Sequence, residues 1–296
     1  MRKLRSMLRR AAGAALALAL LAPPAAAAEF EQRVPAESGG RLRVQLDTGS
    51  VEVEGHDEPE VRVEASSSGL GDTMRFTLEG RGGDIELRGR RRGVMGWLSG
   101  PRVRVHVRVP HAFSLDIRTG GGEVEVEGIA GAVSARTSGG EVSASEIEGP
   151  VELRTSGGSV RVEEVRGDVS ARTSGGPVAI SEVEGRIDAE TSGGRMEIHD
   201  VSGPVHVRTS GGSISVRFSA APAGDIRTSG GGIEVEFPEG SGLRLDARTS
   251  GGGIDLDPRL SLRGRLDRDH VEGDVNGGGE RMEVRTSGGP IRIRAR

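Results

Sequence analysis

The sequence predicts an all-β protein, a single-stranded parallel β-solenoid (β-helix) with 18-residue coils and an irregular N-terminal β cap. Three observations predict this fold. A Thr-Ser-Gly tripeptide recurs at a fixed interval, short runs alternate apolar and polar residues, and glycine pairs separate the runs. A constant short period indicates one structural unit stacked on copies of itself.

The period is set by a series of threonines. Six of them lie 18 residues apart without exception: Thr119, Thr137, Thr155, Thr173, Thr191 and Thr209. The series continues at intervals of 19, 21 and 37 residues with Thr228, Thr249 and Thr286. We therefore expect the regular solenoid over 119–296, with a late insertion near 254–281.

One unit, 132–149, shows what a coil contains. Small apolar residues alternate with polar ones before and after a turn at Gly139-Gly140, so we expect two or three short strands per coil. Identical residues recur at identical positions, which a parallel stack with strands about 4.8 Å apart explains and an antiparallel meander does not. Parallel crossovers favour a right-handed coil, and about nine coils would form a rod of roughly 45 Å.

Residues 29–118 are expected to form the N-terminal β region, with a cap and degenerate first coils. The open ends of a solenoid are sheet edges and need covers. At the other end, 291–294 alternates isoleucine with arginine, and we expect it to close the rod as a charged edge strand. Alternation predicts N-terminal strands at 42–46, 51–54, 61–64, 75–78, 84–87 and 103–109.

The first 28 residues have the pattern of a secretory signal peptide. Five basic residues precede a short apolar run at 11–22, and 26–28 are three alanines that suit cleavage before Glu29. An uncleaved membrane anchor is the alternative, but a span needs about 20 apolar residues and this run is shorter. We therefore expect export past the inner membrane, to the periplasm or the cell surface.

The composition argues against several classes of function. Residues 1–28 carry five positive groups and no acid, so their removal lowers the formal net charge from -4 to -9, which argues against a nucleic-acid partner. The chain has no cysteine, and its only lysine is Lys3, so disulfides and a catalytic lysine in the mature chain are excluded.

The run 103–128, with Val109-Pro110 before a strand and glycine-rich turns, resembles the bacterial "putative adhesin" family of domains of unknown function. The run 51–55 followed by 61–63 has the same character, and the resemblance covers most of 40–296. It implies a signal peptide and a β-solenoid. It implies no established catalytic residues, and "adhesin" is a label of analogy.

In each strand the threonine is an even number of residues from the apolar residues, and such residues point to the same side. Thr137, like Val133, should therefore point inward. An inward hydroxyl can bond along its own ladder or to a turn amide. The alternative is an outward array that orders water, as in ice-binding proteins.

A second series has one arginine in each coil. These arginines occupy the alternate strand positions that should face solvent, and Glu190 interrupts the series. Such a stripe could hold an anionic polymer such as a glycan or a lipid phosphate. The alternative is a solvated face that protects against aggregation. The candidate binding residues of this stripe are Arg136, Arg154, Arg172 and Arg208.

The segment 88–101 combines a basic cluster with apolar residues among glycines. It could insert at a membrane interface or capture a partner. Alternatively, its apolar residues fold back over the open end of the solenoid. Its candidate binding residues are Arg90, Arg91, Arg92, Trp97 and Leu98.

The late insertion gathers oxygen ligands that could take Ca²⁺, but their spacing matches no calcium motif, and we predict neither a metal nor a cofactor. A polar loop explains the same residues. They are Asp255, Asp257, Asp267, Asp269, His270 and Asp274.

These observations favour a non-enzymatic, adhesin-like scaffold, secreted or periplasmic, that binds an envelope or surface partner along its outer face. The partner could be an anionic glycan, a lipid or a protein. One alternative is a periplasmic membrane-associated element that docks through 88–101. Another is a polysaccharide lyase or hydrolase. The sequence shows neither clustered acids and bases nor the stacking aromatics of sugar sites, since it has one Trp, no Tyr and five Phe.

Overall fold

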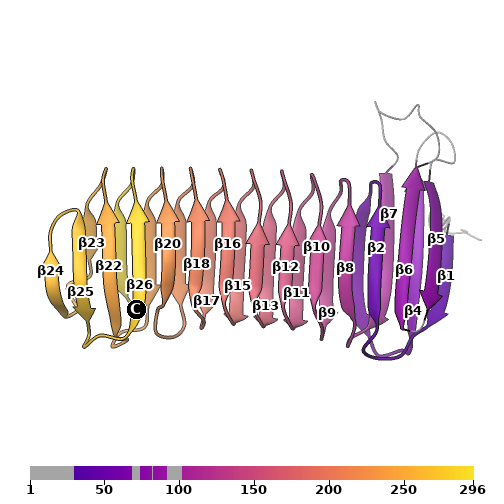
Figure 1. Ribbon diagram of the computed structural model, residues 1–296, viewed down its shortest axis with the longest axis horizontal. Helices are drawn as coiled ribbons and strands as arrows, with labels where there is room; N and C mark the ends of the chain where they lie inside the picture. Colours follow the sequence, from indigo (N-terminus) through magenta and orange to yellow (C-terminus); the bar gives the residue numbers. More distant parts are fainter. Residues whose placement is uncertain (1–29, 69–73, 82, 92–101) are drawn as a thin grey trace, which may run out of the picture.

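The computed structural model describes residues 30–68, 74–81, 83–91 and 102–296, which form a straight rod of β-strands (Figure 1). The strands form a 13-stranded sheet, called sheet A, and a 14-stranded sheet, called sheet B. None of the described residues belongs to a helix long and apolar enough to cross a membrane. The predicted all-β parallel solenoid is confirmed.

Each coil of the body contributes one strand to each sheet, so a coil has two strands. β12 (Val151–Arg154) lies on β10 (Val133–Arg136) in parallel register, and β13 (Val160–Arg166) lies on β11 (Val142–Glu148) in the same way. The 18-residue period of the sequence is therefore the distance along the chain between residues that stack on one another.

The remaining body strands continue this pattern. In sheet A they are β9 (Val124–Ile129), β15 (Val178–Glu184), β17 (Met196–Val201), β19 (Ile214–Phe218) and β21 (Ile233–Phe237). In sheet B they are β8 (Ser114–Thr119), β14 (Val169–Arg172), β16 (Ile187–Thr191), β18 (Val205–Thr209) and β20 (Gly224–Thr228).

A narrow apolar core runs along the rod between the two sheets. The alternating inward positions, such as Val133, Ala135 and Val142, are at most 2% exposed. Small side chains suit this space because the two sheets meet at both turns of every coil. Each coil buries only a few of them, so the coils are stable through their contacts with one another.

The threonine series points inward, as predicted, and closes the turns. Thr137 Oγ1 donates a hydrogen bond to Gly122 O at 2.9 Å, and Thr155 Oγ1 donates to Gly140 O at the same distance. Each acceptor lies in the turn of the preceding coil. The hydroxyl therefore satisfies a carbonyl group that no strand ladder reaches, and it ties one coil to the next.

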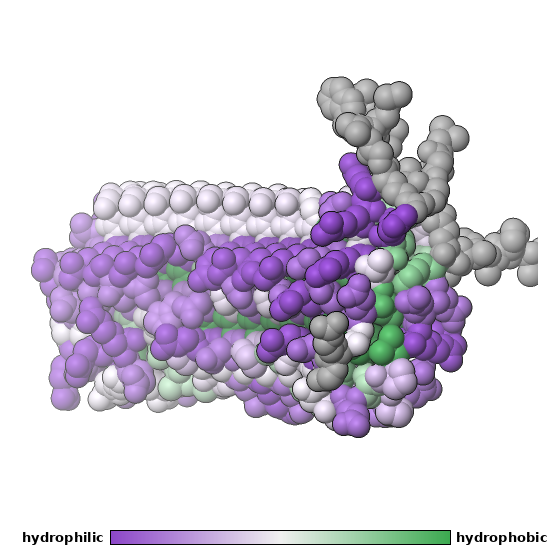
Figure 2. All heavy atoms as spheres, turned by 45° about the vertical axis from the view of Figure 1, so that its right-hand side comes forward, coloured by the Kyte–Doolittle hydropathy of each residue, from purple (hydrophilic) through white to green (hydrophobic). Residues whose placement is uncertain are grey.

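The two glycines of each turn have different roles. A Cβ added to Gly158 would lie 1.9 Å from Gly140 O, so the backbones of successive coils touch at this position. A Cβ added to Gly157 would have its nearest neighbour, Gly139 O, at 3.9 Å. The serine and glycine turns together form the pale, uncharged ridge along the upper edge of the rod in Figure 2.

The N-terminal coils do not follow one another in sequence order. β2 (Arg41–Leu46) and β3 (Ser50–His56) form a coil that pairs in parallel with β8 and β9. On its other side it pairs, also in parallel, with β6 (Asp84–Arg91) and β7 (Arg102–Pro110). The antiparallel strands of the cap lie beyond: β1 (Phe30–Pro35), β4 (Glu60–Ser68) and β5 (Met74–Arg81).

The C-terminal coil is also out of sequence order. β26 (Glu280–Thr286) lies between β20 and β22 (Leu243–Thr249), and β27 (Ile291–Ala295) lies between β21 and β23 (Ile254–Leu256). The expectation that 291–294 forms the terminal edge strand is therefore wrong. The edges at this end are β23 and, after β25 (His270–Val275), β24 (Leu262–Leu266).

The contrast between the two turn glycines gives a prediction. Gly158→Ala should destabilise the fold by about 1–3 kcal/mol, the usual cost of forcing extra atoms into a packed site. The matched variant Gly157→Ala should change the free energy of unfolding by less than about 0.5 kcal/mol. Urea denaturation followed by circular dichroism measures both values. Equal effects of the two substitutions would contradict the backbone contact.

Candidate functional site

The predicted arginine stripe exists on the outer face of sheet B. Arg136, Arg154 and Arg172 are register partners on successive strands, and their side chains are 37%, 46% and 42% exposed. Glu190 follows as the next partner, and Arg208 follows Glu190. The structure thus brings these four candidate residues into one line along the rod.

Acids lie beside this stripe at alternate coils, where the neighbouring row reads Ser134, Glu152, Ser170, Asp188 and His206. Glu152 lies two residues before Arg154 on the same face, 2.6 Å from Arg154 and 3.0 Å from Arg136. Partial desolvation alone would raise the pKa of Glu152. The hydrogen bond from Arg136 and the nearby guanidinium charges outweigh that effect, so the pKa is lowered. The outer face of sheet B therefore presents a band of paired charges with a reduced positive potential.

The pairing is weakest where Glu190 interrupts the stripe. Arg172 Nε is 3.9 Å from Glu190 Oε2, and Arg208 forms no ion pair with any residue the structure describes. A hollow of about 370 Å³ lies here, and Asp188 and His206 also line it. Of the four stripe arginines, Arg208 is thus the most available to an external anion.

The basic segment 88–101 lies partly outside the described residues. Arg90 and Arg91 end β6 and are exposed. Arg91 N donates to Asp47 Oδ2 at 2.9 Å. Three candidate residues of this segment fall outside the described residues: Arg92, Trp97 and Leu98.

Four of the five aspartates predicted as oxygen ligands in the late insertion, all but Asp269, form ion pairs with arginines. Asp257 is 5% exposed and accepts hydrogen bonds from Arg259 and from Ala295 N, which hold its pKa well below the usual range. Asp255 pairs with Arg294 in the same way. These two carboxylates therefore stabilise the last coil and do not converge on a common cation.

The outer face of sheet A, in contrast, carries a concentration of acids at its N-terminal half. Across four neighbouring strands, β4, β7, β3 and β9, one row reads Glu64, His106, Glu52 and Glu125. The pKa of Glu125 is raised by partial desolvation and then by the charges of four other glutamates: Glu52, Glu127, Glu123 and Glu141. This face is therefore strongly negative.

Within this acidic row, the structure brings three potential metal ligands together. One ligand atom each from Glu52, Glu54 and His106 lies within 4.8 Å of the others. His106 Nε2 is 3.2 Å from Glu54 Oε2, and Arg108 Nε is 3.4 Å from the same oxygen. The hollow beside them has a volume of about 760 Å³ and is open to solvent.

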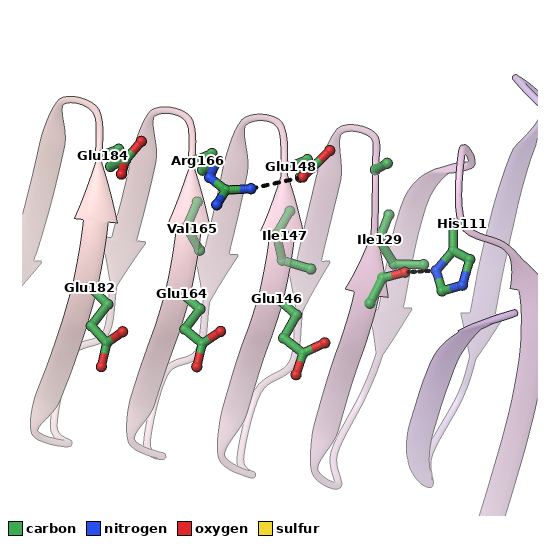
Figure 3. Close-up of a pocket in the computed structure, with 12 residues that line it drawn as sticks. His111, Ile129, Glu146, Ile147, Glu148, Glu164, Val165, Arg166, Glu182 and Glu184 are labelled. Carbon is green, nitrogen blue, oxygen red and sulfur yellow. Dashed lines mark hydrogen bonds and ion pairs between the residues drawn. The ribbon is translucent and has the colours of Figure 1, made fainter.

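A second acidic feature follows the edge where sheet A bends (Figure 3). Glu146, Glu164 and Glu182 have φ values of 55°, 53° and 54°, in the left-handed region. Each bends its strand so that its own side chain faces outward while the next residue, such as Ile147, returns to the core. The resulting groove of about 560 Å³ ends at His111.

Sequence reasoning missed the acidic face. Its signal was present in the alternating glutamates of 52–54 and 123–127, which share the outward parity. What the sequence does not contain is the order of the coils. His106 and Glu52 are 54 residues apart, and they meet only because the β6–β7 coil lies on the β2–β3 coil.

Comparison with known proteins gives the following matches. A family profile described as Toastrack DUF4097 matches residues 40–294. Curated protein sequences gave no match. Among solved structures, a "putative adhesin" from Parabacteroides distasonis is 12% identical, covers 90% of this chain and 96% of its own, and has a TM-score of 0.50. A "putative lipid binding protein" from the same organism has the same identity and coverage and a TM-score of 0.41.

The opposite environments of two glutamates give a prediction on pH dependence. Glu125→Gln should raise the melting temperature at pH 7, by about 1 °C, because the fold disfavours the charged form of Glu125. Glu152→Gln should lower it, because the fold favours the charged form of Glu152.

The sign follows from linkage. A raised pKa contributes stability at low pH that is lost as the pH rises, and a lowered pKa contributes stability that is lost as the pH falls. Both differences should therefore shrink at about pH 4, where carboxyl groups protonate. Thermal unfolding of the two variants at both pH values measures this. A shift in the same direction at pH 7 would contradict the assignment.

Proposed function

The chain belongs to the Toastrack DUF4097 family, and from that premise we propose that it is a non-enzymatic, exported, adhesin-like rod that binds an envelope or surface partner along its outer faces. The family match bears out the resemblance found in 103–128. The observation that carries the proposal is the repetition of one charged surface over successive coils of sheet B.

Repetition of this kind suits an extended partner. A polymer that lies along the rod contacts an equivalent group at every coil, so many weak contacts add up. Individual exposed ion pairs contribute only about 0.2–1 kcal/mol each, which makes a single coil a poor binding site. The surface hollows are open and lined by charged groups, in keeping with contact along a face.

The chemistry of the partner follows from the arginine stripe. Arg136, Arg154, Arg172 and Arg208 can each donate two parallel hydrogen bonds to a carboxylate, sulfate or phosphate group. Glu152 holds the guanidinium groups of Arg136 and Arg154 in position, and Arg208 has no ion pair with any described residue, so its guanidinium group is free to bind an anion. We therefore place an anionic glycan on sheet B, close to Arg208.

This proposal predicts a loss of binding to an anionic polysaccharide, with dextran sulfate as the probe. Replacing all four stripe arginines by Gln should weaken binding about 10- to 30-fold, if each contact contributes roughly 0.5 kcal/mol. Binding should also fall steeply with added salt. The matched control replaces by Gln three outward arginines of sheet A and the exposed arginine just before β17: Arg161, Arg166, Arg217 and Arg195.

Biolayer interferometry on immobilised dextran sulfate, with neutral dextran as the blank, measures these affinities. A loss confined to the sheet B variant supports the stripe as the binding face. Equal losses in both variants, or binding that salt does not change, would contradict the assignment of the stripe as the binding face. Depolymerisation of the polysaccharide would overturn the non-enzymatic part of the proposal.

A second candidate function is docking to a membrane through 88–101. Its support is the pair of exposed arginines, Arg90 and Arg91, that lead into a segment containing Trp97 and Leu98. A basic cluster followed by apolar residues suits the surface of an anionic bilayer.

This alternative predicts that Trp97→Ala abolishes sedimentation with phosphatidylglycerol vesicles, because an interfacial aromatic anchor is lost. The variant that lacks the four stripe arginines should still sediment. If Trp97→Ala sediments like the unaltered chain, 88–101 is not a membrane anchor.

A further inference from the structure

Two parallel strands of sheet A place a histidine opposite a glutamate at the first coil of the rod. His106 on β7 is the register partner of Glu52 on β3. Glu54 follows Glu52 by two residues, so its side chain faces outward on the same side of the sheet. The three side chains converge, and their ligand atoms lie within 4.8 Å of one another.

The imidazole of His106 has a nitrogen without a hydrogen bond. Nε2 is shielded from solvent and forms no hydrogen bond, although Glu54 Oε2 lies 3.2 Å away. A shielded polar atom without a hydrogen bond is unfavourable, and a bound ion is one way in which it can be satisfied. This nitrogen lies 3.2 Å from Glu54 Oε2 and within 4.8 Å of a carboxylate oxygen of Glu52, so the three groups are placed as the ligands of one cation would be.

From this geometry we propose that Glu52, Glu54 and His106 bind a divalent transition-metal ion of the zinc class. Carboxylate oxygens and an imidazole nitrogen are zinc ligands at roughly 2.0–2.2 Å, and Ca²⁺ or Mg²⁺ prefer oxygen ligands alone. Three protein ligands leave one position for water or for a group of a partner, and the open hollow beside the triad gives access to it.

The surroundings support a cation at this position. Glu64 lies beside His106 on β4, and Glu125 lies beside Glu52 on β9, so two further carboxylates flank the triad. Their charge attracts a cation. Arg108 contacts Glu54 from the adjoining position and holds its carboxylate in place, as outer residues of metal sites do.

The site would link two coils that are distant in sequence. β3 and β7 belong to the β2–β3 and β6–β7 coils, and β7 is the strand at which the parallel stack meets the antiparallel cap. A bound ion would therefore join the β2–β3 coil to the β6–β7 coil on which the antiparallel cap lies. Because it binds the folded chain, it should raise the melting temperature as its concentration rises.

The test uses the untagged exported chain, freed of metal with a chelator that is then removed by dialysis. Competition with a colorimetric zinc indicator should give one Zn²⁺ per chain. His106→Gln and Glu52→Gln should each weaken binding at least about tenfold. Substituted Co²⁺ should give visible absorption bands that both substitutions remove.

Two matched controls distinguish loss of the triad from loss of any outward histidine or glutamate. His206→Gln changes a histidine on the opposite sheet, and Glu197→Gln changes a glutamate in the same row of sheet A, farther along the rod. Neither should alter zinc binding. All four side chains are on outer faces, and thermal unfolding in the presence of chelator confirms that each variant is folded.

Three outcomes would overturn the site. One is the absence of zinc binding at millimolar concentration. Another is zinc binding that His106→Gln leaves unchanged. The third is binding of Ca²⁺ as tight as that of Zn²⁺ and insensitive to His106→Gln, which would identify a diffuse acidic surface in place of a coordinating triad.

Discussion

The contact of backbone with backbone at the second turn glycine is the constraint on which the rest of the structure depends. At Gly140, Gly158 and Gly176 a Cβ would lie within about 2 Å of the carbonyl oxygen of the preceding coil. Thr155, three residues before Gly158, closes the preceding turn and accepts from the amide of Gly158 at 3.3 Å. These contacts fix the spacing between successive coils and place each turn directly on the turn before it.

A fixed register places identical side chains directly above one another, which creates a problem for charged rows. Two like charges about 5 Å apart repel by about 0.8 kcal/mol in water. Sheet B relieves this repulsion, since acids such as Glu152 lie between neighbouring arginines. Sheet A has no arginine beside Glu125 in its row, and the pKa of Glu125 is raised by partial desolvation and by the charges of the neighbouring glutamates. The two faces of one rod thus differ in the kind of partner they can attract.

The body of this fold could be predicted from the sequence because the 18-residue period shows which residues of neighbouring strands pair with one another. The inward threonines and the outward arginines follow from the parity of residues around Thr137 and Arg136. The ends could not be predicted in the same way. The β2–β3 coil and the β26–β27 coil both have alternating residues that would fit several neighbours, and the sequence period does not say which neighbour they pair with.

The same reason separates the parts of the surface that could be predicted from those that could not. The arginine stripe arises from residues that are 18 apart, so its line along the rod is a property of the repeat. The triad of Glu52, Glu54 and His106 arises from a pairing across 54 residues that breaks the repeat order. Its geometry is therefore visible only in the folded chain.

The out-of-order coils have a physical consequence for the rod. The last strand, β27, has paired neighbours on both sides, and Arg296 adds an ion pair with Asp200 at 3.0 Å. A C-terminal strand held in this way cannot fray from an open edge, as the final strand of a simple solenoid can. Three of the four outer edges are antiparallel strands, β1, β5 and β24, whose hydrogen-bonding differs from that of a parallel coil, and the fourth is the three-residue parallel strand β23. Since antiparallel strands do not continue the parallel stacking of the coils, most of the surface at both ends differs from the repeated surface, and the long faces of the rod are the surfaces that repeat.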